Sequence, residues 1–334
     1  LRGRLHPALP VEGATRAPLN RIGFIGGKMG VDHYVEEKAY TKTFAELKSG
    51  GFIKQRQKDL YTVRLRCPGG MIPAEWLPKI SEVAKKYGRG VVHTSVRMSI
   101  EIPYVNIKDF DQVIKELETV GVRIASCGPR VRVPIACGGC EYNPNGLTDT
   151  QKLCKEVDNR YFGTPTHHKF KISFSGCPID CMRTRESDLG FQGIVEPVWD
   201  EHTCTGCTLC AKVCQEGAIV SRKEDGKPIY DPSKCIYCGD CIRACPSESW
   251  TAKRTGHLVR VGGKHGRHPL EAMETAKFVK DEEVFTVLEK TLEWYKVNGK
   301  RGERIGKTIR RVGIESYKKA VHGYKEQQDL GEPI

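Results

Sequence analysis

The run Cys204-Thr-Gly-Cys207-Thr-Leu-Cys210-Ala-Lys-Val-Cys214 sets the architecture of this chain, because it places four thiols at short, fixed intervals. A second run, Cys235-Ile-Tyr-Cys238-Gly-Asp-Cys241-Ile-Arg-Ala-Cys245-Pro246, repeats the spacing C-x2-C-x2-C-x3-C. In such paired runs three thiolates bind one [4Fe–4S] cluster and the fourth crosses to the other. We therefore predict two clusters, one held by Cys204, Cys207, Cys210 and Cys245, the other by Cys214, Cys235, Cys238 and Cys241.

Zinc is the alternative metal for these cysteines, since structural zinc sites also use four thiolates. Zinc sites more often pair two C-x2-C units, whereas two nested four-cysteine runs favour iron. The two runs thus predict a ferredoxin-type domain at residues 200–252. Two clusters in series imply delivery of electrons to an acceptor elsewhere in the chain.

A second group of cysteines precedes the ferredoxin-type runs. Cys137-Gly-Gly-Cys140 and Cys177-Pro-Ile-Asp-Cys181 supply four more thiols, and a third [4Fe–4S] cluster is the simplest interpretation. The alternative is that they are buried free cysteines. The remaining cysteines have no partner at short range and are expected to be structural: Cys67, Cys127 and Cys154.

Length and composition describe a globular chain of more than one domain. It has 334 residues, of which 39% are hydrophobic and 28% charged, and no apolar run of about 18 residues that could cross a bilayer. The opening Leu1-Arg-Gly-Arg4 lacks the apolar core of a secretory signal. With 15 cysteines in metal-type spacings, we expect a reducing, cytoplasmic environment.

The net charge of +13 does not indicate nucleic-acid binding, because the basic residues are scattered rather than grouped with aromatics. An anionic cofactor, an anionic substrate and an acidic electron donor explain the charge equally well.

Periodicity predicts mixed secondary structure of the α+β class. Alternation predicts strands at 60–66, 90–102, 169–174 and 257–264, and helical spacing predicts helices at 35–47, 73–87, 107–120 and 282–296. The sequence His257-Leu-Val-Arg-Val-Gly-Gly-Lys264 repeats the strand and Gly-Gly of Val63–Gly70. This similarity hints at an internal duplication.

Five short motifs resemble the siroheme-containing sulfite and nitrite reductase superfamily: Arg64-Leu-Arg-Cys-Pro-Gly-Gly70, His93-Thr-Ser-Val-Arg97, Arg132 five residues before Cys137, Lys169-Phe-Lys171, and Ser175-Gly-Cys-Pro-Ile-Asp-Cys181. The resemblance runs from Phe52 to the C-terminus. Its layout is similar to the catalytic subunit of anaerobic sulfite reductases and to the subunits of dissimilatory sulfite reductases. The family usually has C-x5-C at the first cysteine pair, whereas here Asn143 stands where that second cysteine would fall.

The resemblance implies a domain order along the chain. We expect an N-terminal arm at 1–51, a ferredoxin-like half-domain at 52–124, a siroheme/[4Fe–4S]-binding α/β domain at 125–199, the inserted two-cluster ferredoxin domain at 200–252, and a second, duplicated half-domain with C-terminal helices at 253–334. It also implies a siroheme whose iron shares the thiolate of Cys181 with the adjacent cluster.

The resemblance further implies a cationic substrate pocket. Four residues match the anion-binding arginines and lysines of the family: Arg66, Arg132, Lys169 and Lys171. Five others resemble positions that hold siroheme carboxylates: His93, Thr94, Arg97, Arg260 and Lys264. Arg64, on the same strand and face as Arg66, is expected to be a cofactor contact or a second anion ligand. Residues two apart on a strand point to one face, so Lys169 and Lys171 could reach one pocket. An exposed strand edge is the alternative for that pair, and an ordinary strand histidine the alternative for His93.

The function implied is that of the catalytic subunit of a sulfite reductase, in which sulfite undergoes six-electron reduction to sulfide with electrons relayed through the clusters. Two alternatives remain open, namely nitrite reduction to ammonia and a non-catalytic electron-transfer subunit. Neither a G-x-G-x-x-G after a strand nor a P-loop occurs. We therefore expect a separate flavin or iron–sulfur electron donor, and either an oligomer or a complex of several different subunits.

Overall fold

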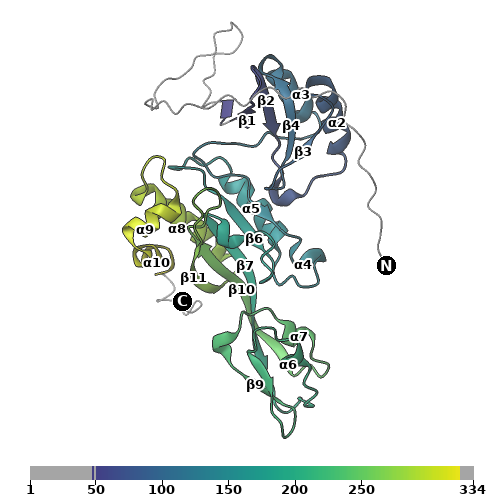
Figure 1. The fold of residues 1–334 in the computed structure, drawn as a ribbon, viewed down its shortest axis with the longest axis vertical. Helices are drawn as coiled ribbons and strands as arrows, with labels where there is room; N and C mark the ends of the chain where they lie inside the picture. The colour runs from purple at the N-terminus through teal and green to yellow at the C-terminus, as the bar shows by residue number, and fades with distance from the viewer. Residues whose placement is uncertain (1–46, 49, 324–334) are drawn as a thin grey trace, which may run out of the picture.

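The computed structural model describes residues 47–48 and 50–323. Within these ranges the strands form a four-stranded sheet in the order β1-β2-β4-β3, a five-stranded sheet in the order β11-β10-β7-β6-β5, and the two-stranded sheet β8-β9. Figure 1 shows the three sheets as successive parts of an elongated molecule. The helix expected at 35–47 lies, apart from Leu47, outside the described residues, as does most of the expected N-terminal arm.

The N-terminal unit is an antiparallel sheet with helices packed on it. Its elements are β1 (Phe52–Lys54), β2 (Leu60–Arg64), the 3-10 turn η1 (Pro68–Gly70), α2 (Trp76–Tyr87), β3 (His93–Thr94), β4 (Ile100–Asn106), η2 (Ile107–Asp109) and α3 (Phe110–Glu118). Apolar residues at every second position of β2 lie in a core shared with the helices, where Val63, Val83 and Phe110 are fully buried. Alternation in the sequence therefore locates β2 correctly, and helical spacing locates α2 and α3 correctly.

The single strand expected at 90–102 is wrong, because this stretch is a hairpin. The chain leaves β3 at Thr94, turns, and returns as β4 from Ile100. The Ser95 hydroxyl accepts hydrogen bonds from the backbone N–H groups of Arg97 and Ser99, and Met98 has φ 62°. A serine side chain that caps backbone donors in this way favours a turn over an extended strand.

The central sheet is mixed. Its strands are β5 (Ile135–Ala136), β6 (Ile172–Ser175), β7 (Leu189–Trp199), β10 (Trp250–Val261) and β11 (Met273–Val279); β5, β6 and β7 run parallel, whereas β10 and β11 are antiparallel additions. One core joins this sheet to α5 (Thr150–Tyr161), α8 (Glu283–Asn298), α9 (Ile305–Val312) and α10 (Ile314–His322). The rings of Phe174 and Phe191 stack in that core with centroids 5.2 Å apart.

The strand expected at 169–174 begins later than predicted. It starts at Ile172, so Lys169 and Lys171 lie in the segment that leads into β6. The strand expected at 257–264 is the second half of β10, which ends at Val261.

The segment assigned to a second half-domain does not form a separate sheet. Strand β10 pairs with β7 from Trp250↔Trp199 to Val261↔Leu189, and β11 pairs with β10. Long pairing with β7 places both strands in the central sheet, and the boundary expected at 252/253 falls within β10.

The stretch between β7 and β10 forms a small unit at one end of the molecule (Figure 1). It contains α6 (Leu209–Val213), β8 (Ile219–Ser221), β9 (Pro228–Tyr230), η4 (Pro232–Lys234) and α7 (Asp240–Arg243). Both connections to the central sheet run through paired strands, because Trp199 and Trp250 are partners in the β7/β10 ladder. Among the residues that the structure describes, no helix is both long and apolar enough to span a membrane.

Candidate functional site

The two cysteine runs adopt the same backbone conformation. In the first run Gly206 and Thr208 have φ of 69° and 66°, and the matching residues of the second run, Tyr237 and Gly239, have φ of 60° and 76°. Left-handed residues at these points turn backbone N–H groups toward the cysteines, as the donation from Tyr237 N to Cys235 Sγ at 3.3 Å illustrates. Such donors suit an anionic iron–sulfur cluster.

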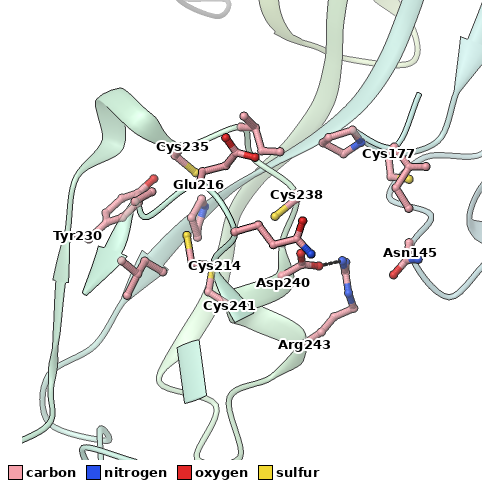
Figure 2. A pocket seen from close by; sticks show the side chains of 18 residues that line it. Asn145, Cys177, Cys214, Glu216, Tyr230, Cys235, Cys238, Asp240, Cys241 and Arg243 are labelled. Carbon is pink, nitrogen blue, oxygen red and sulfur yellow. Dashed lines mark hydrogen bonds and ion pairs between the residues drawn. The ribbon is translucent and has the colours of Figure 1, made fainter. Parts of the chain in front are cut away.

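Four thiols from both runs line one cavity of about 390 Å³ in this unit: Cys214, Cys235, Cys238 and Cys241. Figure 2 shows their sulfur atoms around the cavity, with Cys177 of the central domain across from them. Burial raises the pKa of Cys238 to about 11 and that of Cys241 to about 12; Asp240 and then Cys235 add to the first shift, and Cys235 and Cys238 add to the second. Thiols that hinder one another's ionisation in this way are suited to a cationic metal centre that compensates their charge.

The other four predicted ligands belong to the same unit but do not line that cavity. Burial raises the pKa of Cys210, with further contributions from Cys207 and Cys204. For Cys245 burial acts in the same direction, but backbone N–H groups of the following loop and the Ser247 hydroxyl bring its pKa below the ordinary value. A loop whose donors converge on one sulfur favours its thiolate form.

The third group brings together three of its four predicted ligands. Cys137 and Cys181 both contribute to the raised pKa of Cys177, whose main cause is burial. Cys137 Sγ also accepts hydrogen bonds from Gly139 N at 3.4 Å and Gly176 N at 3.1 Å. A Cβ at Gly176 would lie 2.9 Å from the Gly139 Cα, so the two backbone segments that donate to this sulfur lie too close together for a side chain between them.

Cys140 stands apart from this group. It is exposed at the start of α4 (Gly139–Tyr142), and the groups that raise its pKa, after burial, are carboxylates and not thiols. Within the described part of the chain, no three His, Cys, Asp or Glu side chains are gathered as for a single metal ion. In a cubane each thiolate binds a different iron, so its ligands stand farther apart than those of one ion.

The loop between Cys177 and Cys181 is held by Asp180. Its carboxylate accepts hydrogen bonds from the Ser175 hydroxyl at 2.7 Å and from the N–H and hydroxyl of Thr184 at 2.9 and 3.0 Å. Thr184 opens η3 (Thr184–Glu186), which lies over β7. This carboxylate therefore ties the cysteine loop to the end of β6.

Predicted cationic residues from three separate segments share one electrostatic environment. Burial lowers the pKa of Lys171 to about 8, with further lowering by Arg97, Arg304 and Lys169. Burial also lowers the pKa of Lys169, followed by the effects of Arg304 and Arg132. The pKa of Arg97 falls to about 10 through burial and the charge of Arg132. These side chains therefore lie close enough to act on one another's charge.

Arg97 donates to the Val133 carbonyl at 2.6 Å, and Arg132 to the Ser126 carbonyl at 3.1 Å. Other predicted site residues are also bonded to protein groups. Arg66 donates to Asp158 at 2.7 Å and lies over the Phe162 ring, whereas Arg64 and His93 both bond Glu101. Thr94 is exposed beside His93 in β3.

On the central sheet, Arg260 is buried and bonded to Glu274, Thr184 and Gln192. Lys264 follows β10 and contributes to the lowered pKa of His168, after burial, Lys169, Arg304 and Arg132.

Two residues that sequence reasoning missed lie beside the cationic group. Asp188 and Arg304 form a buried, two-pronged ion pair with contacts of 2.7 and 2.6 Å. They are separated by 116 positions, and neither belongs to a motif that the sequence displays. Only the packing of the folded chain brings these two side chains into contact.

Comparison with known families assigns the chain to a class. The nitrite and sulphite reductase 4Fe-4S domain model matches residues 127–329, and the nitrite/sulfite reductase ferredoxin-like half domain model matches residues 53–120. The chain therefore belongs to the nitrite and sulfite reductase family.

Particular relatives are sulfite reductases. The coenzyme F420-dependent sulfite reductase of Methanocaldococcus jannaschii is 32% identical over 88% of this chain, which spans 47%, about half, of that relative. A subunit of the anaerobic sulfite reductase of Salmonella typhimurium is 30% identical over 64% of this chain and 70% of its own length. The crystal structure of dissimilatory sulfite reductase I shares the fold, with a TM-score of 0.67 and 22% identity over 79% of this chain and 69% of that one.

Proposed function

We propose that this chain is the catalytic subunit of a sulfite reductase that reduces sulfite to sulfide. The observation that carries this proposal is the convergence of Arg97, Arg132, Lys169 and Lys171 on one region at the start of β6, while Cys177 follows the end of the same strand. A group of cationic side chains thus lies one short strand away from a cysteine site. The named sulfite reductases among the relatives favour the same substrate.

The residues present fit a siroheme and three [4Fe–4S] clusters. Cys137, Cys177 and Cys181 would hold the cluster next to siroheme, with Cys181 as the shared thiolate, and Cys140, which lies apart from them here, is the predicted fourth ligand. The two cysteine runs would hold the others, and Arg64, His93, Thr94, Arg97, Arg260 and Lys264 remain the predicted contacts of the macrocycle and its carboxylates. When bound, these groups supply one-electron transfer and a metal centre for the oxyanion.

The cationic residues would bind the oxyanion and deliver protons to it. Six electrons and seven protons convert sulfite to hydrosulfide and three waters, so the pocket must both hold negative charge and supply hydrogen. Arg132 holds a permanent charge, whereas Lys171, with a pKa of about 8, is protonated at neutral pH yet can release its proton readily. Arg66 stays a predicted anion ligand, although its guanidinium bonds Asp158 here.

The cavity supports an order for the two ferredoxin-type clusters. Cys177, Pro178 and Ile179 of the central domain line the same cavity as Cys214 and the second run, whereas no cysteine of the set Cys204, Cys207, Cys210 and Cys245 does so. The cluster of the second run would therefore be the proximal one. A separate donor protein would reach the cluster of the first run, where Cys207 is exposed.

Nitrite reduction to ammonia is the second candidate, because the matched family models cover nitrite and sulfite reductases alike. The chain would be purified anaerobically, its absorption spectrum recorded, and reduced methyl viologen oxidation measured with sulfite and with nitrite. A haem-type Soret band with sulfide as product supports the proposal. Faster turnover of nitrite would make nitrite the substrate, and iron–sulfur absorbance without turnover would make the chain an electron-transfer subunit.

A further inference from the structure

The strongest unassigned feature is the buried ion pair of Asp188 and Arg304. Asp188 is fully buried and Arg304 is 7% exposed, and the guanidinium donates through two nitrogens to the two carboxylate oxygens. Planar two-pronged pairing of this kind is geometrically specific. A buried ion pair contributes little net stability. Its role therefore lies in the position or the charge of neighbouring groups.

This pair is joined to Lys171 through the main chain. The backbone N–H of Lys171 donates to Asp188 Oδ2 at 2.9 Å, and the N–H of Leu189 donates to the Lys171 carbonyl at 3.1 Å. Gly262 N donates to the Asp188 carbonyl at 2.9 Å. Asp188 therefore fixes the point where the chain enters β6 relative to β7 and β10.

The pair also acts on the charge of Lys171. The charged groups that face its ammonium are Arg97 from the N-terminal unit, Lys169 from its own segment, Arg304 before α9 and Asp188 before β7. Of these, the three cations lower the pKa of Lys171 and Asp188 raises it, while Arg304 has a larger effect than Asp188. Arg304 also lowers the pKa of Lys169, Arg132 and His168.

We propose that the Asp188–Arg304 ion pair is a positioning device that fixes Lys171 at the pocket and sets the balance of charge at its ammonium group. The inference rests on the proposed function for the role of Lys171, but the pair itself can be tested without turnover. Asp188 offsets part of the lowering that the neighbouring cations impose on the pKa of Lys171. Burial raises the pKa of Asp188 itself, and the Arg304 guanidinium acts against that rise.

The test is competitive labelling of the full chain with acetic anhydride across a pH series, with the labelling of each lysine read by mass spectrometry. Asp188→Asn removes the compensating charge, so we expect the pH of half-maximal labelling of Lys171 to fall by roughly one unit. Arg304→Gln removes a cation whose effect on Lys171 exceeds that of Asp188, so we expect that midpoint to rise even if Asp188 takes up a proton in this variant. If the pair had only a structural role, the labelling midpoint of Lys171 would shift in the same direction in both variants.

Glu303→Gln is the matched control, because it removes a carboxylate one position from Arg304 that pairs with Arg311 instead. Its Lys171 midpoint should equal that of the wild type, and Lys253, which pairs with Glu196 at the surface, should label identically in every variant. Equal midpoints in wild type, Asp188→Asn and Arg304→Gln overturn the proposal, and so do shifts of one sign in both variants. If Asp188→Asn does not fold, Arg304→Gln decides, since an unchanged or lower midpoint contradicts the proposal.

Turnover separates this inference from the proposed function. In an active enzyme, the alkaline limb of the pH dependence of sulfite reduction should move to lower pH in Asp188→Asn by the shift that labelling shows. A wild-type chain without sulfite turnover would refute the proposed function, whereas opposite labelling shifts in the two variants would still support the role of the pair.

Discussion

Lys171 shows how burial and like charges adapt one side chain to a proton-transfer role. Its ammonium is taken partly out of water and faces Arg97, Arg304 and Lys169, and both effects disfavour the charged form. The resulting pKa of about 8 lies near neutral pH, where a general acid works best.

Replacement of Lys171 by methionine should lower kcat for sulfite by at least about 100-fold, because a proton donor is lost. In the wild type kcat should fall as pH rises through about 8, since the ammonium form is the active one and deprotonates there. A pH series with reduced methyl viologen measures both effects. A wild-type rate that stays constant up to about pH 10 would contradict this role.

Asp180 should be essential for the cysteine loop. Asp180→Ala removes three hydrogen bonds and leaves a non-glycine residue at φ 54°, so we expect a loss of about 3 kcal/mol in the free energy of unfolding. Asp180→Asn, which keeps an acceptor and tolerates this backbone, should lose less than half as much. Thermal unfolding measures the difference, and equal midpoints in the two variants would show that the carboxylate bonds do not hold the loop.

At the scale of elements, α5 connects the N-terminal unit to the central sheet. Asp158 of α5 bonds Arg66 just beyond β2, and Gln151 of the same helix donates to the carbonyl of Gly69 at 3.1 Å. Gly69 has φ 63°, and a Cβ there would lie 2.3 Å from Gln151 Oε1. The helix thus holds the end of β2, which carries Arg64, and the residues just beyond it, which include Arg66, in a fixed position.

Arg66→Met should lower the free energy of unfolding by about 3 kcal/mol, because it leaves the nearly buried Asp158 carboxylate without its partner. Arg66→Lys should be intermediate, since an ammonium cannot make both contacts. Thermal unfolding and steady-state kinetics should be measured together. An unchanged unfolding midpoint with a reduced kcat/KM for sulfite would mean that Arg66 is chiefly a substrate ligand.

At the scale of the whole molecule, the predicted crossing of the cysteines would link the two runs to the path of electrons. The proposed proximal set takes Cys214 from the first run, and this cysteine lines the same cavity as Cys177. Cys214 and Cys245 both pack against the small core that contains Cys210, Cys241 and Trp250. In the proposed assignment each cluster would depend on both runs.

Cys214→Ser and Cys245→Ser should each reduce the iron content from roughly thirteen to roughly nine per chain, because each removes a ligand from a different cluster. Cys154→Ala is the control, since this buried cysteine belongs to no predicted cluster and should leave the iron content unchanged. Iron analysis after anaerobic purification measures this. Full iron content in both serine variants would refute the crossed assignment.

Local patterns explain what could be predicted. Cysteine spacing identified the two runs, alternation located β2, and helical spacing located α2, α3 and α8. These signals can be read from sequence because ligand geometry and amphipathic periodicity are encoded within a few neighbouring residues. The hairpin at Ser95 was missed, since a turn held by one hydroxyl interrupts an otherwise strand-like pattern.

By itself, the sequence determined the family resemblance and the cysteine spacings that predict iron–sulfur clusters, and it singled out the cationic residues of the predicted substrate site. Only the tertiary structure decided that β10 and β11 complete the central sheet, that Arg66 bonds Asp158, and that Asp188 and Arg304 meet beside Lys171. The physical reason is distance along the chain. The partners of the Arg66 and Arg304 pairs are 92 and 116 positions apart, so only packing of the whole chain brings them into contact.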